Sequence, residues 1–111
     1  MKKDDIRTIN TLRALFPSEL KVSVMRSENG NFVAHIDTFQ GLFTEGSNFS
    51  ELIEMVNDAV KTYFEVPAKF LSYMPNYIPP LRVAQRLDIF PVTEASETVV
   101  FPISSGEKTA R

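Results

Sequence analysis

The chain has 111 residues, a length that fits one domain, because single domains usually contain about 100–150 residues. It contains no cysteine, which excludes disulfides, thiolate metal sites and cysteine nucleophiles. Twelve basic side chains against fourteen acidic ones give a net charge of −2, which argues against a protein that holds nucleic acid by bulk charge.

Residues 1–19 form an N-terminal extension. Apolar residues from Ile6 to Phe16 follow helical spacing, which predicts a short amphipathic helix that ends before Pro17. The basic start of the chain is followed by no apolar run of signal-peptide length. No stretch approaches the roughly 18 apolar residues of a membrane span. We therefore expect a cytoplasmic protein with no membrane contact.

The central module, residues 20–66, begins with three predicted strands. Apolar and polar residues alternate over 20–25 and again over 32–37, the pattern of half-buried strands. The Asn-Gly pair at 29–30 is typical of a tight hairpin turn, because both turn positions require positive φ. Residues 42–45, bounded by glycines, predict a short third strand. These segments together predict an antiparallel β-meander.

An amphipathic helix is predicted over residues 48–65. Asn48 suits the N-cap position, and Glu51 three residues later completes a variant of the capping box. The apolar residues follow the spacing of one helix face, and Pro67 limits the helix at its C-terminal end. The opposite face carries four carboxylates, which are Glu51, Glu54, Asp58 and Glu65. We therefore expect one helix face to pack on the sheet and the other to be acidic and exposed.

Residues 67–111 form a tail that contains six of the seven prolines. Proline fixes φ and removes a donor, so we expect neither a long helix nor an uninterrupted central strand in the tail. One or two helical turns are predicted at 68–74, and residues 98–103 predict a fourth strand. The whole chain, 1–111, is thus predicted to be a single α+β domain with the element order β-β-β-α-β.

The sequence shows no recognisable catalytic, metal-binding or cofactor-binding pattern. The one histidine, His35, alternates outward on a predicted strand and has no identifiable orienting partner for a catalytic triad. Gly41 and Gly46 have the spacing of a phosphate-binding loop, but the lysine that must follow is missing. No EF-hand or zinc-protease spacing exists. We therefore expect no enzymatic activity, no metal and no cofactor.

Four carboxylates suggest one catalytic alternative, a metal-dependent nuclease: Asp37, Glu45, Glu51 and Asp58. However, the helix carboxylates are predicted to point away from the sheet. Asp37 and Glu45 lie near strand ends, where solvation accounts for them. We therefore do not favour catalysis.

The segment after the predicted helix is rich in aromatic and other large apolar residues. A small domain cannot bury every one of these rings, and Tyr, Phe and Met are enriched at the centres of protein interfaces. Core packing and a protein interface are both open for this segment. Phe70, Tyr73 and Tyr77 belong to this segment and are candidates for such an interface.

Four short motifs follow one another through the central module: Gly30-Asn31-Phe32-Val33-Ala34, Phe39-Gln40-Gly41, Thr44-Glu45-Gly46 and Asn48-Phe49-Ser50-Glu51. Over residues 20–65 this ordered set resembles the HicB family, the antitoxin half of a bacterial toxin–antitoxin pair. The family tends to have proline, acid and proline where this chain has Asp37, Thr38 and Gln40. No DNA-binding domain is expected, because after residue 66 neither a strand-helix-helix stretch nor two uninterrupted helices is predicted.

The resemblance implies a fold like a truncated ribonuclease H sheet without its catalytic carboxylates. It also implies an antitoxin that covers the active surface of a small, basic, RNA-cleaving toxin, a HicA-like protein. The family associates with itself, so the resemblance further implies a homo-oligomer whose self-association uses Phe70, Tyr73 and Tyr77. Residues 22–66 carry two basic and seven acidic side chains, a net charge of −5 that suits a basic partner. The toxin is therefore expected at the helix face of Glu51, Glu54, Asp58 and Glu65.

Two other functions stay open. The chain could be a solitary HicB-like protein-interaction domain without a toxin. It could also be a degenerate nuclease-fold module that binds RNA.

Overall fold

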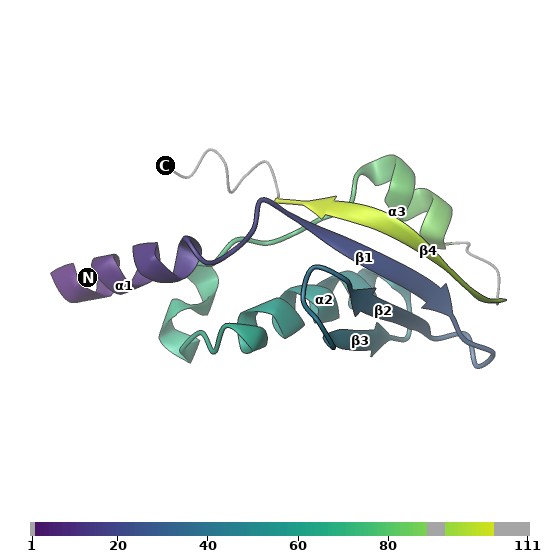
Figure 1. Ribbon diagram of the computed structural model, residues 1–111, viewed down its shortest axis with the longest axis horizontal. Coiled ribbons are helices and arrows are strands. Elements are labelled where there is room, and N and C mark those ends of the chain that lie inside the picture. Colours follow the sequence, from purple (N-terminus) through teal and green to yellow (C-terminus); the bar gives the residue numbers. More distant parts are fainter. Residues whose placement is uncertain (1, 89–92, 104–111) are drawn as a thin grey trace.

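The computed structural model describes residues 2–88 and 93–103, which form an α+β fold (Figure 1). The elements are α1 (Lys3–Arg13), β1 (Glu19–Arg26), β2 (Phe32–Ile36), β3 (Phe43–Gly46), α2 (Phe49–Tyr63), the 3₁₀ helix η1 (Ala68–Tyr73), α3 (Leu81–Asp88) and β4 (Thr93–Pro102). The strands form one antiparallel sheet of order β3-β2-β1-β4. The predicted α+β class is confirmed, and η1 and α3 stand between the long helix and the last strand.

The register of the sheet follows the alternation in the sequence. Val22 pairs with Ile36 across β1 and β2, and Leu20 pairs with Phe101 across β1 and β4. All four side chains are fully buried, so one face of the sheet is apolar from β2 to β4. The turn between β1 and β2 contains Gly30 with a φ of 88°, but Asn29 has no positive φ, so the predicted turn with positive φ at both positions is wrong. The hydrogen bonds of Ser27 to Gly30 and Asn31 close a longer turn instead.

Helix α2 covers the apolar face of the sheet, with Leu52, Val56 and Val60 fully buried. The backbone of α2 lies so close to β3 that a Cβ added at Gly46 would lie 2.7 Å from the backbone nitrogen of Leu52. Only glycine therefore fits at this position, because the opposing atoms belong to the backbone. This contact fixes the start of α2 against the edge of the sheet.

Helix α1 extends beyond the end of the sheet, and η1 attaches it to the body (Figure 1). The Arg13 guanidinium donates to the carbonyl of Tyr73, and Lys69 lies 3.5 Å from a carboxylate oxygen of Asp5. The predicted N-terminal helix is confirmed, and so are the helical turns expected after Pro67, as η1.

The tail is more regular than the sequence suggested. Strand β4 begins at Thr93, five residues earlier than predicted, and it pairs with β1 from Glu19 to Arg26, with a register shift between Val24 and Arg26. Helix α3 was not predicted, because the prolines before it were interpreted as helix breakers. Pro79 and Pro80 instead precede its first residue, where a missing N–H costs nothing, and Pro80 accepts the first helical bond from Ala84.

The division of the chain into residues 1–19, 20–66 and 67–111 is not tested by the structure and stays a prediction. Two parts of the tail, 89–92 and 104–111, lie outside the described residues. Within the described ranges, none of the helices has the length and apolar character needed to cross a membrane.

Candidate protein-binding surface

All four carboxylates of the predicted partner-binding face are exposed, but they play different structural roles. Glu51 is part of the N-terminal cap of α2. Its Oε1 accepts from the backbone N–H of Ser47 at 2.7 Å, and its own N–H donates to Oδ1 of Asn48 at 2.8 Å. The predicted capping-box variant is therefore confirmed, with the return bond made to Ser47.

Glu65 does not lie on the helix, because α2 ends at Tyr63 and not near residue 65. The predicted boundary is wrong by about one half-turn. The N–H of Glu65 donates to the carbonyl of Thr62 at 2.9 Å, and the N–H of Val66 donates to that of Lys61 at 3.1 Å. This pair of bonds is the Schellman motif, and it places Glu65 in the left-handed region with a φ of 54°. Its carboxylate therefore leaves the face that Glu54 and Asp58 share.

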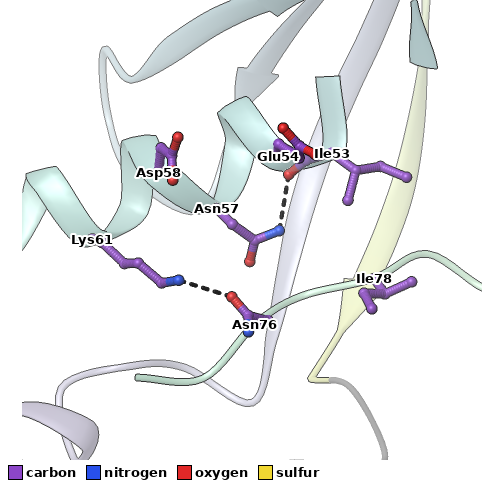
Figure 2. A pocket seen from close by; sticks show the side chains of 7 residues that line it. All are labelled: Ile53, Glu54, Asn57, Asp58, Lys61, Asn76 and Ile78. Carbon is purple, nitrogen blue, oxygen red and sulfur yellow. Dashed lines mark hydrogen bonds between the residues drawn. The ribbon is translucent and has the colours of Figure 1, made fainter. Parts of the chain in front are cut away.

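Glu54 and Asp58 flank a hollow of about 330 Å³ beside α2 (Figure 2). Neither carboxylate makes a hydrogen bond or ion pair to any residue within 2–88 or 93–103. Ile53 and Ile78 line one end of the hollow. At the other end the Lys61 ammonium donates to Oδ1 of Asn76 at 2.8 Å, so this cation is held by the opposite wall.

Asn57 fixes that opposite wall against α2. Its side chain is 7% exposed, and its Nδ2 donates to the carbonyls of Ile53 and Tyr77, each at 2.9 Å. The backbone N–H of Tyr77 donates in return to Oδ1 of Asn57 at 2.6 Å. The helical pattern of the sequence places Asn57 on the same exposed face as Glu54 and Asp58, and this expectation is wrong, because Asn57 is buried. The amide satisfies both backbone groups of Tyr77, as a neighbouring strand would.

The predicted self-association surface is wrong for two of its three residues. Phe70 is 5% exposed and Tyr77 is fully buried, so neither presents its ring to a partner. The Tyr77 hydroxyl donates to the carbonyl of Pro17 at 2.5 Å, and burial raises the pKa of this hydroxyl. Both rings pack in the core because the tail folds back between α1, α2 and β4. Tyr73 remains on the surface with 41% of its area exposed.

A second hollow, of about 220 Å³, lies between α2 and α3. Its lining includes Phe49, Ile53 and Ala84, with Ser50 and Gln85 at polar positions. Ile53 lines both hollows, so they lie next to each other along the same side of α2. Sequence reasoning missed the wall formed by residues 76–85. The one local signal of this wall in the sequence is Asn57 in the middle of the predicted helix, because a short amide side chain at such a position must find backbone partners.

The four carboxylates of the nuclease alternative do not gather at one place. Asp37 accepts a hydrogen bond from Ser23, and Glu45 pairs in register with Val33, so both belong to the face of the sheet that α2 does not cover. Glu51 and Asp58 lie on α2. Within the described ranges, no three His, Asp or Glu side chains form a group suited to a metal ion. His35 is exposed and stacks on Phe43 at 5.8 Å between ring centroids.

The comparisons with known proteins give one partial similarity. Over 47 residues the chain is 34% identical to a UPF0150 protein of Thermotoga maritima. The matched part covers 42% of this chain and 66% of that protein, just under two thirds of its length. No family model matches the chain, and no solved structure matches it.

Proposed function

We propose that this protein is a HicB-like antitoxin that neutralises a small, basic, RNA-cleaving toxin by binding it, without catalysis of its own. Two findings support the proposal beyond the motifs in residues 20–65. One is the similarity to the UPF0150 protein, whose family name is a HicB-like one. The other is the surface of α2.

The observation that carries the proposal is the pair of exposed carboxylates of Glu54 and Asp58 beside a hollow, neither of which is paired with a residue in the described part of the chain. An acidic surface attracts a basic protein and repels RNA, and Lys61, the one cation among the described residues of this lining, offsets only one of the two carboxylates. A toxin docked here therefore has its own RNA-binding surface covered. Glu51 and Glu65 are exposed as well, but they lie outside the lining of the hollow.

The test is a charge reversal measured against a basic protein encoded next to this chain. We expect Glu54→Lys with Asp58→Lys to slow association about tenfold at low salt in surface plasmon resonance. The matched control is Glu28→Lys with Glu45→Lys, which changes net charge equally at exposed positions away from α2. Circular dichroism checks that both double variants fold.

Three outcomes separate the candidate functions. Slower association of the α2 variant alone supports the proposed surface. Equal effects of both variants show that total charge and not α2 decides binding. If no neighbouring basic protein binds the wild type, the proposal is wrong and a solitary interaction domain accounts better for the fold.

A further inference from the structure

The two hollows beside α2 share Ile53, and we call them together the α2 groove. Their lining on α2 extends from Phe49 to Lys61, about 18 Å along a helix that rises 1.5 Å per residue. One wall is α2 and the other is the chain from Asn76 to Gln85.

The groove is apolar at its centre and negatively charged at one rim. Ile53 and Ile78 face it from opposite walls, and Ile78 is 49% exposed although it is a large apolar side chain. Glu54 and Asp58 stand one helical turn apart on the α2 wall, about 6 Å between Cβ atoms in such pairs. Lys61 is the one basic side chain among the described residues that line the groove, and Asn76 holds its ammonium at the far end.

We propose that the α2 groove is the docking site for an arginine side chain of the basic partner, a proposal that rests on the function proposed above. The apolar stem of an arginine covers Ile53 and Ile78, while its guanidinium donates to the carboxylates of Glu54 and Asp58. The planar, weakly hydrated guanidinium has five donors, so it can serve two carboxylates and still lie on an apolar surface. A lysine ammonium is compact and strongly hydrated, and it fits this combination less well.

The charges of the groove disfavour the other classes of occupant. Phosphates of RNA would stand against two carboxylates, and Lys61, the one cation among the described lining residues, offsets only one of these charges. A purely apolar segment would cover Glu54 and Asp58 without pairing them, which carries a desolvation penalty. A basic side chain with a long apolar stem matches both parts of the lining.

The experiment titrates the isotope-labelled full chain with N-acetyl-arginine amide and follows amide signals by NMR. Two matched probes are N-acetyl-citrulline amide, a neutral molecule of nearly the same shape, and N-acetyl-lysine amide. We expect saturable shifts at residues 53–61 and at the side-chain amide of Asn76. The apparent Kd should be at least about tenfold weaker for citrulline and about threefold weaker for lysine, because only arginine combines charge with a planar donor set.

Variants locate the contact. Glu54→Gln with Asp58→Asn should weaken arginine binding about tenfold, and Ile78→Ser about threefold through loss of the stem contact. Glu28→Gln with Glu45→Gln, which removes the same charge elsewhere, should leave the affinity unchanged. Equal binding of arginine and citrulline, shifts that map away from α2, or an unchanged Kd in the Glu54/Asp58 variant would each overturn the proposal.

The toxin measurement in the previous section separates this proposal from the function on which it rests. If the neighbouring basic protein binds and depends on Glu54 and Asp58 while arginine amide does not bind, the antitoxin function stands and the arginine site is wrong. If arginine amide binds as described while no basic protein is neutralised, the groove is a guanidinium site and the antitoxin function is wrong.

Discussion

The two sides of α2 are attached to the rest of the chain by different forces. On the sheet side, Leu52, Val56 and Val60 are fully buried among apolar neighbours and close-packed along the strands. On the tail side, the amide of Asn57 and the ammonium of Lys61 reach across to Tyr77 and Asn76. Apolar packing closes the first contact completely, because dispersion and burial favour the smallest gap.

On the tail side, polar bonds of fixed length hold the two segments together, and the α2 groove lies beside these bonds. The comparison shows that one helix can close a core with one face and leave a groove along the other. Single substitutions on the two sides should therefore have different consequences.

Asn57→Ala should have the largest effect, a loss of about 3 kcal/mol in the free energy of unfolding. The substitution leaves the buried N–H and C=O of Tyr77 without partners, and each unsatisfied group costs about 1–3 kcal/mol. Urea unfolding measures the loss, and hydrogen exchange should show faster exchange at the Tyr77 amide.

Asn76→Ala is the matched control, because it removes one half-exposed bond to Lys61 and should cost about 0.5 kcal/mol. Equal losses for the two alanine variants would contradict the role of Asn57 as the attachment of the tail.

Gly46→Ala tests the sheet side and should lower the free energy of unfolding by about 2 kcal/mol. The new Cβ would lie 2.7 Å from the Leu52 nitrogen, so α2 must move away from β3. Gly41→Ala is the control, because its Cβ meets open space and only the left-handed backbone, with a φ of 77°, opposes it. Thermal unfolding of both variants shows which costs more stability, the close approach of α2 at Gly46 or the left-handed backbone at Gly41. A smaller loss at Gly46 than at Gly41 would show that the sheet side is less tightly packed than described.

Tyr77→Phe should cost about 1 kcal/mol through loss of the bond to the Pro17 carbonyl. It should also change the alkaline stability profile. Burial raises the pKa of Tyr77 in the folded protein, so the unfolded state loses this proton first, and the wild type loses stability as pH rises above about 10.

Tyr77→Phe should lack the part of the loss of stability at alkaline pH that Tyr77 causes. Urea unfolding from neutral pH to the highest pH at which the protein folds measures this difference. Tyr73→Phe removes an exposed hydroxyl and is the matched control. An unchanged alkaline profile in Tyr77→Phe would show that the buried hydroxyl is not the group responsible.

Glu65→Gly should have the smallest effect and the opposite sign, a gain of about 0.5–1 kcal/mol. Glycine adopts the left-handed conformation at this C-terminal cap without steric cost, whereas glutamate with a φ of 54° does not. Thermal unfolding measures the gain. In the proposed function, the same variant should bind the neighbouring basic protein at an unchanged rate within about twofold, because Glu65 does not lie on the face that Glu54 and Asp58 share. A destabilised variant would contradict the Schellman geometry.

The sequence allowed much of the central module to be predicted, because its signals are local. The Asn-Gly turn, the alternation over the first two strands and the Asn48 cap each act within a few residues. The predicted end of α2 was too late because Glu65 occupies the left-handed position of the C-terminal cap, where glycine is usual. Without a glycine, the sequence does not indicate that the helix ends there.

The groove could not be predicted, because its second wall depends on contacts between distant residues. Asn57 and Tyr77 are separated by twenty residues, and Tyr77 and Pro17 by sixty. Aromatic residues after Pro67 gave no sign of which rings those contacts would bury. Glu54 and Asp58 were found as part of an acidic face, whereas Ile78 and Asn76 have no sequence pattern that places them opposite α2.

The central claim is that the α2 groove face neutralises a basic, RNA-cleaving partner, and RNA cleavage tests it most directly. Cleavage of a labelled RNA by the neighbouring basic protein should stop when the wild-type chain is added at an equal molar amount. The Glu54→Lys/Asp58→Lys variant should need at least about tenfold more protein for the same inhibition, while the Glu28→Lys/Glu45→Lys control inhibits like the wild type. Full inhibition by the α2 variant at equal molar amount, or no inhibition by the wild type, would contradict the account.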